Sequence, residues 1–202
     1  MPAEAVTTSV LDLQRIVIKF FAVNPAPADP GTFIPILHRW IQTRRVEGML
    51  VDVADYGHLP DGPGVVLIGH EADYFLDSME GPFGLLYSRK APLSGSLADR
   101  IRAAFRAALV ACARLEEEPE FKGTLKFKAG EPLFIANDRL LAPNTEETFA
   151  ALRPELEGAL RSIYGGAQVA LVRDARDPRS RLTVRITTSE PVEVATLLSR
   201  IG

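Results

Sequence analysis

Hydrophobic and polar positions along the chain follow two different periods. Runs of β-branched and aromatic residues bounded by turn residues predict strands, whereas apolar residues at helical spacing predict helices. The predicted strands are residues 14–23, 49–54, 65–70, 83–89, 124–128, 132–136, 168–173 and 181–188. The predicted helices are residues 32–45, 97–117, 145–164 and 192–200, and Pro154 predicts a kink or a break in the third.

This order of elements predicts an α/β (α+β) fold, with a mixed sheet and helices packed mainly on one face. The helical connections predict right-handed crossovers between parallel strands, whereas the second and third strands of each half resemble antiparallel hairpins. We interpret the chain as a single domain, residues 1–202, built from two ferredoxin-like halves, residues 10–118 and 121–202. The similar order and spacing of the halves fit either a duplication or two α/β units of similar size.

The composition is that of a globular protein. Of the 202 residues, 47% are hydrophobic and 24% charged, and the net charge of −3 lacks the basic excess of a nucleic-acid-binding protein. The single cysteine, Cys112, excludes an intrachain disulfide, and its helical pattern predicts a buried thiol. The polar N-terminus and the lack of an apolar run of ~20 residues predict a cytoplasmic protein with no membrane partner.

The segment from Asp52 to Asp73 has the highest density of side chains that could take part in catalysis or metal binding. It holds two of the three histidines, His58 and His70, and five carboxylates, which are the residue types of many metal sites. If residues 49–54 and 65–70 form a hairpin, however, the two histidines lie at its opposite ends, roughly 15 Å or more apart. We therefore predict no metal site. The glycines of this segment lack a phosphate-loop pattern, and we predict no cofactor.

Polar residues that follow neighbouring strands are expected to form one rim, because these strands should end at the same edge of the sheet. They are Asn24, Asp55, His58, Asp61, Arg89 and Lys90. We interpret His58 as a candidate general acid/base, oriented by Asp55 or Asp61, with Arg89 and Lys90 as ligands for an anion. The competing interpretation is a solvated loop in which the aspartates cap turns.

Polar residues in the second half form another group of candidate ligand-binding residues. Asn137 and Arg139 take the place there that Asn24 takes in the first half, and would flank the same groove if the halves pack pseudo-symmetrically. Arg176 belongs to a turn of alternating charge, to which Arg173 and Arg185 add, and which fits an anion or partner surface, or a turn that neutralises itself. The acidic run 116–118 is interpreted as a solvated helix end or a contact for a basic partner.

Three segments resemble those of a bacterial protein family of similar length that has no assigned activity. They are residues 38–42, 52–71 and 137–144, with the sequences HRWIQ, DVADYGHLPDGPGVVLIGHE and NDRLLAPN. The resemblance covers most of the chain and implies a bacterial cytoplasmic protein. It carries no catalytic residue over to this sequence.

The sequence contains no nucleophile–base pair, no set of four metal ligands and no cofactor-binding loop motif. This absence favours a non-catalytic protein that binds a small anionic ligand or a protein partner. One alternative is a small hydrolase or lyase that uses His58 as general acid/base on an anionic substrate. Another is a subunit of a larger assembly, and a homodimer is also left open. Whether the protein is an enzyme is not decided by the sequence.

Overall fold

Strands and helices occupy most of the chain in the structure, a computed structural model that describes residues 10–24, 30–59 and 62–201. The strands are β1 (Ile16–Phe21), β2 (Leu50–Asp55), β3 (Val65–Gly69), β4 (Ala72–Asp77), β5 (Gly84–Arg89), β6 (Leu133–Ala136), β7 (Val169–Arg173) and β8 (Leu182–Thr188). The α-helices are α2 (Phe33–Thr43), α3 (Leu97–Glu116), α4 (Glu146–Ile163) and α5 (Val194–Ile201). The predicted α/β (α+β) class is confirmed, although α4 runs without a break through Pro154.

The strands of the described residues form one sheet, in the order β2-β3-β4-β5-β1-β6-β8-β7. Every pairing between neighbours is antiparallel, so the predicted mixed sheet with parallel crossovers is wrong. The β2-β3-β4-β5 meander returns beside β1, which places β2 at the edge of the sheet. The first half contributes five strands and the second three, and the ferredoxin-like halves are not confirmed. The strand predicted at residues 124–128 forms only an isolated bridge between Phe127 and Ala22.

One strand was not predicted from the sequence pattern. β4 carries two charged residues, Asp73 and Asp77. Their charges obscured the alternation on its other side, where Ala72, Tyr74 and Leu76 are buried. Each strand of a meander runs opposite to the strand before it. A prediction that omits one strand therefore places the C-terminal end of the next strand at the wrong end of the sheet. The omitted strand therefore explains why some predicted site residues lie at the other end of the sheet from the one expected.

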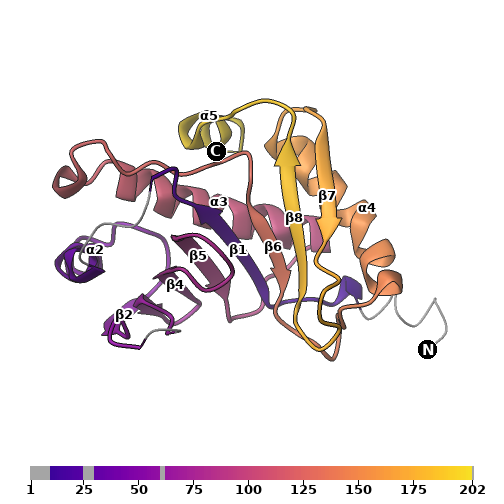
Figure 1. The fold of residues 1–202 in the computed structure, drawn as a ribbon, viewed down its shortest axis with the longest axis horizontal. Helices are drawn as coiled ribbons and strands as arrows, with labels where there is room; N and C mark the ends of the chain where they lie inside the picture. Colours follow the sequence, from indigo (N-terminus) through magenta and orange to yellow (C-terminus); the bar gives the residue numbers. More distant parts are fainter. Residues whose placement is uncertain (1–9, 25–29, 60–61, 202) are drawn as a thin grey trace.

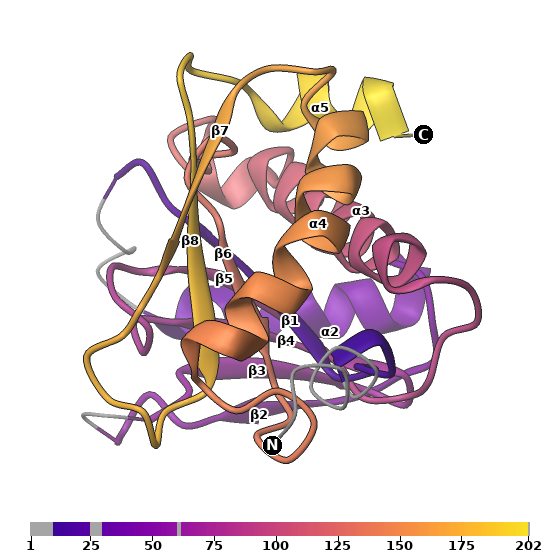
Figure 2. The same cartoon turned by 90° about the vertical axis from the view of Figure 1, so that its right-hand side faces the viewer.

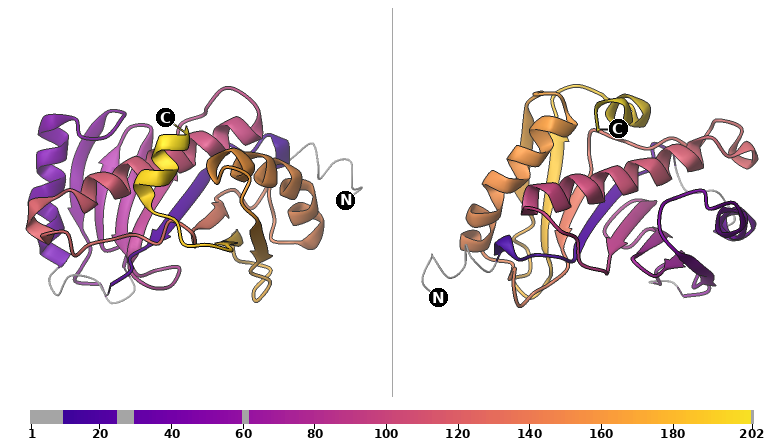
Figure 3. Two further views of the ribbon diagram at one scale, coloured as in Figure 1. Left: turned by 90° about the horizontal axis from the view of Figure 1, so that it is seen from above. Right: turned by 180° about the vertical axis from the view of Figure 1, so that it is seen from behind.

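The helices cover one face of the sheet. In Figure 1 the strands lie in front of α3, and in the view from behind, α3 lies in front of them (Figure 3). In the side view, α4 and α5 lie on the same side of β7 and β8 as α3 (Figure 2). Alternate strand residues, such as Ile18 and Phe20, join these helices in one apolar core. Cys112 is fully buried in this core, as predicted.

The face of the sheet that points away from the helices is here called the open face. A small apolar cluster forms its centre, made by Val17, Phe21, Leu86, Leu133 and Ile135. One row of neighbouring residues crosses this face from strand to strand: Val66, Phe75, Leu86, Lys19, Leu133, Arg185 and Val172. Two cations, Lys19 and Arg185, therefore stand in a row that is otherwise apolar.

The acidic run at the end of α3 joins this helix to α2. Glu118 is only 6% exposed and accepts a hydrogen bond from the indole Nε1 of Trp40 at 2.6 Å. It also forms an ion pair with Arg39. The interpretation of residues 116–118 as a solvated end is therefore wrong for Glu118, which anchors α2 to the core.

Candidate functional site

The looped end of the β2–β3 hairpin carries the residues predicted as a catalytic rim. The register of the hairpin confirms that His58 and His70 lie beyond its opposite ends. His58 is exposed and has no hydrogen bond or ion pair within the described part of the chain. Asp55 accepts a hydrogen bond from the amide of Gly57 at 2.8 Å and so caps the turn, and Asp61 lies outside the described residues. No described residue orients the imidazole of His58.

Arg89 and Lys90 do not reach this rim. Arg89 is the last residue of β5, at the end of the sheet where β3 ends and β4 begins. The prediction that both cations lie at the same end as His58 is therefore wrong. The physical reason is the additional strand β4, which reverses the direction of β5. Lys90 Nζ is bound to Asp73 Oδ1 at 2.7 Å, and Arg89 Nε donates to the carbonyl oxygen of Ala91 at 2.7 Å.

The remaining predicted ligand-binding residues lie in separate places. Asn24 is at the same end of the sheet as His58, where its amide donates a hydrogen bond to a backbone carbonyl at 3.0 Å. Asn137 and Arg139 are at the opposite end, along a pocket of about 500 Å³. The groove that Asn24 and Asn137 would share under pseudo-symmetry is therefore not formed. Arg176 lines a different and larger pocket.

This larger pocket lies on the open face, between two loops, and has a volume of about 840 Å³. We call it the open-face pocket. Strands β6 and β8 form its floor, the β4–β5 loop forms one side, and the end of β7 with the following turn forms the other. Its lining includes Glu80, Gly81, Leu133, Val172, Asp174, Arg176 and Arg185. A pocket of this volume suits a ligand of small-molecule size.

Arg185 is the charged group in this pocket that is best placed to bind an anion. Its guanidinium lies over the ring of Phe21, with 5.9 Å between the guanidinium carbon and the ring centroid. Among the described residues it has no ion-pair or hydrogen-bond partner for its side chain. A guanidinium binds carboxylates and phosphates through two parallel hydrogen bonds. The donors of Arg185 are available for such an interaction.

The β4–β5 loop is held beside this pocket by a buried ion pair. Lys19 Nζ donates to Asp77 Oδ1 at 2.6 Å, and the two residues are 0% and 4% exposed. The same carboxylate oxygen accepts a hydrogen bond from the amide of Met79 at 3.0 Å. Gly81 then lies against the ring of Phe21 with a φ of 127°, a conformation that favours glycine. The loop is therefore fixed at its start and at its tip.

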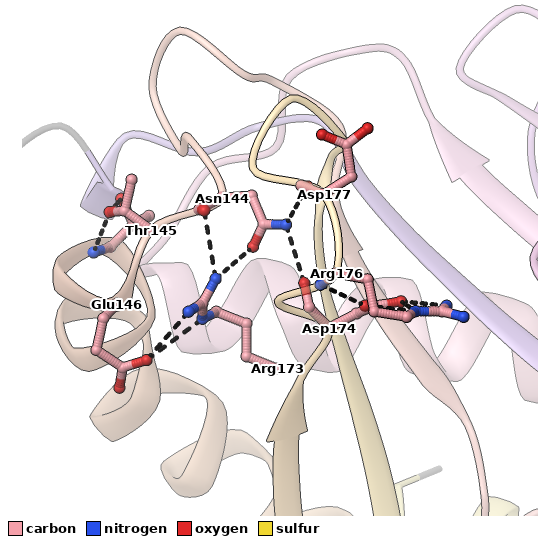
Figure 4. A network of polar contacts seen from close by, with 8 residues as sticks. Asn144, Thr145, Glu146, Arg173, Asp174, Arg176 and Asp177 are labelled. Carbon is pink, nitrogen blue, oxygen red and sulfur yellow. Dashed lines mark hydrogen bonds and ion pairs between the residues drawn. The ribbon is translucent and has the colours of Figure 1, made fainter.

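A polar network fixes the opposite side of the pocket (Figure 4). The side-chain amide of Asn144 donates to the backbone carbonyls of Asp174 and Asp177 at 2.9 and 3.0 Å. Arg173 donates to the side-chain oxygen of Asn144 at 3.0 Å and forms an ion pair with Glu146 at the start of α4, at 3.3 Å. These contacts hold the β7–β8 turn against the N-terminus of α4.

Arg176 already has a carboxylate partner within this turn. Its Nε donates to both carboxylate oxygens of Asp174, at 2.9 and 3.1 Å, and these hydrogen bonds lower the pKa of Asp174 to about 2. The turn thus neutralises part of its own charge. The tips of the two sides are joined by an ion pair between Glu80 and Arg181. Arg176 lines the pocket, and its role in ligand binding stays a prediction.

Two important residues of this site were not chosen from the sequence as ligand-binding residues. Lys19 interrupts an apolar run in a strand that is buried on both faces, and a charge at such a position is itself a signal that a partner must lie nearby. Arg185 follows the strand alternation as an exposed residue. No pattern in a single sequence distinguishes it from an ordinary surface arginine.

The described residues contain no group of three or more histidine, cysteine or acidic side chains able to hold a metal ion. In the same part of the chain, no helix combines the length and the apolar character that crossing a membrane requires. Comparison with protein-family models, with curated proteins and with solved structures found no match to this chain.

Proposed function

We propose that the protein binds a small organic anion in the open-face pocket, with the anionic group on Arg185. One observation carries this proposal. The guanidinium of Arg185 lies over Phe21 in the floor of the pocket and forms no hydrogen bond or ion pair with a described residue, although the charge of Asp174 in the same pocket acts on it. A carboxylate or phosphate group satisfies such a guanidinium with two parallel hydrogen bonds.

The surroundings of Arg185 support an anion with an apolar body. Leu133 and Val172 flank it in the row of residues that crosses the open face, and Val172 is 61% exposed. The two acidic residues of the lining each form an ion pair with another arginine. The pocket thus offers one arginine that forms no ion pair with a described residue, between apolar surfaces and within electrostatic reach of Asp174.

Both sides of the pocket are held by the protein's own contacts. The Lys19–Asp77 pair fixes one loop, and the hydrogen bonds of Asn144 fix the other. A site that is already ordered costs less conformational entropy when a ligand binds. This supports a binding function without a large rearrangement of the protein.

Isothermal titration calorimetry with 1-naphthyl phosphate tests the proposal, because this probe joins an anionic head to a two-ring apolar body. We expect Arg185→Met to weaken binding by about 10- to 100-fold, since charge-assisted hydrogen bonds are lost. Arg161→Met is the matched control, because it removes an exposed arginine from α4, on the other side of the sheet. This control is expected to keep the affinity of the parent protein.

Two results contradict the proposal. One is equal affinity of the parent and Arg185→Met for the probe. The other is the lack of measurable binding by the parent at millimolar probe concentration. Circular dichroism of each variant establishes that the sheet is retained, so that a loss of binding reflects the missing guanidinium.

A further inference from the structure

A second, smaller cavity lies on the helix side of the sheet, between α3 and strands β4 and β5. Its volume is about 270 Å³, and we call it the tyrosine cavity. Tyr74, Tyr87 and Arg89 line it from the strands, and Ala103 and Ala107 line it from α3. Because alanine carries only a methyl group, α3 leaves space between itself and the sheet at this point.

The side chain of Tyr74 contributes a hydroxyl to this cavity. Tyr74 is 4% exposed, and its ring packs edge-on against Tyr87 with 5.3 Å between the ring centroids. No described residue forms a hydrogen bond with the hydroxyl. The hydroxyl still has some contact with solvent, since the only fully buried side-chain polar atom without a partner in the described residues is Arg114 Nε. Burial also raises the pKa of Tyr74, so the phenol keeps its proton and acts as a donor at neutral pH.

Arg89 supplies a positive charge to the same cavity. Its Nε donates to the carbonyl oxygen of Ala91, and a hydrogen bond with Tyr87 opposes the rise in the pKa of Tyr87 that burial causes. Arg89 is half-buried and forms no ion pair within the described part of the chain. A partly buried guanidinium that lacks an ion pair has donors available for an anionic ligand.

Two carboxylates also line the cavity, and each is engaged by another group. Glu71 accepts a hydrogen bond from the amide of Met49 at 2.9 Å, which lowers the pKa of Glu71. Glu47 is largely exposed and forms an ion pair with Arg106 at 2.7 Å. Neither carboxylate forms an ion pair with the guanidinium inside the cavity.

We infer that the tyrosine cavity is a second ligand site, which takes a one-ring monocarboxylate. The carboxylate accepts hydrogen bonds from the Tyr74 hydroxyl and the Arg89 guanidinium, and the ring packs against Ala107 and Leu93. At ~30 Å³ per water, the cavity has room for about nine water-sized groups, which suits one ring and a carboxylate. The site does not depend on the open-face pocket, which lies on the other side of the sheet.

Calorimetric titration with benzoate tests this inference. Tyr74→Phe removes only the hydroxyl, and we expect it to weaken benzoate binding about tenfold. Tyr56→Phe makes the same chemical change at an exposed position of the chain and is expected to leave the affinity unchanged. Ala107→Leu fills the cavity with an apolar side chain and is expected to abolish binding. Its circular dichroism and unfolding temperature establish whether α3 keeps its fold.

Arg185→Met separates the two proposed sites, because it removes the guanidinium of the open-face pocket alone. We expect this variant to bind benzoate as tightly as the parent. The inference is overturned if the parent binds no benzoate at millimolar concentration, or if Tyr74→Phe binds it with the affinity of the parent. It is also overturned if Arg185→Met abolishes benzoate binding, since that result places the carboxylate on the open face.

Discussion

Lys19 has no exposed surface and stands in the middle of the sheet. Such a charge is costly to bury unless a partner compensates it, and Asp77 does so at 2.6 Å. In the register of the sheet, Gly84 of β5 stands between Asp77 and Phe21. Because glycine has no side chain, the lysine reaches across β5 to the carboxylate. The pair ties β1 to β4 and fixes the start of the loop beside the open-face pocket.

Replacement of Lys19 tests the importance of this pair. We expect Lys19→Met to lower the free energy of unfolding by about 3–5 kcal/mol, because Asp77 is left buried without a counter-charge. In Lys19→Met/Asp77→Asn the amide removes that charge and still accepts the hydrogen bond from Met79, so part of the stability should return. Urea unfolding followed by circular dichroism measures both effects. A loss below about 1 kcal/mol in the single variant would show that the pair contributes little.

At the level of single residues, sequence patterns predicted burial better than chemistry. Cys112 lies on the apolar stripe of its helix, and its burial followed from that spacing. The sequence pattern did not distinguish arginines that pair with protein groups from arginines that are available to a ligand. Arg89 and Arg176 were predicted to bind a ligand, whereas Arg185 was only grouped with the charged turn, and it is the arginine of the open-face pocket that forms no ion pair or hydrogen bond with a described residue. Which arginine is paired depends on contacts between distant segments.

At the scale of elements, one strand decided the position of the predicted site. The helices and most strands follow from their hydrophobic periods. The strand β4 did not, because Asp73 and Asp77 alternate with its apolar residues, and its omission placed Arg89 at the wrong edge. The carboxylate of Asp77 is tolerated in a buried strand because Lys19 of β1 forms an ion pair with it. That pairing spans 58 residues of sequence and is not visible in a local pattern.

The β7–β8 turn is the element whose stability should depend most clearly on pH. Hydrogen bonds from Arg176 lower the pKa of Asp174 from 3.8 to about 2 in the folded protein. A depressed carboxyl pKa stabilises the folded state above the unfolded value, and this contribution disappears as the pH falls through the folded value. We therefore expect the parent to be more stable than Asp174→Asn above pH ~4, with the difference closing towards pH ~2.

Thermal unfolding of the parent and Asp174→Asn between these two pH values measures this difference. Asp12→Asn, which changes an exposed aspartate outside the turn, serves as the control for the loss of a charge. A difference between Asp174→Asn and the parent that stays constant over the whole range would mean that the Asp174–Arg176 contact does not set the pKa.

At the scale of the whole molecule, the two halves share one antiparallel sheet. β1 pairs with β5 of its own half on one side and with β6 of the other half on the other side. The class of fold and the helix-covered face could be predicted, since both follow from the elements themselves. The order of the strands could not, because it depends on pairings between distant segments. This order brings the β4–β5 loop and the β7–β8 turn together on the open face.

The central claim is that the open-face pocket binds a small organic anion through Arg185. The most direct measurement is a titration of the ¹⁵N-labelled protein with 1-naphthyl phosphate, followed by amide chemical shifts in two-dimensional NMR spectra. We expect the largest shifts at Gly81, Val172, Thr183 and Arg185, which line the pocket from both sides and from its floor. Unchanged amides at these four positions, or shifts confined to the loop around His58, would contradict the claim.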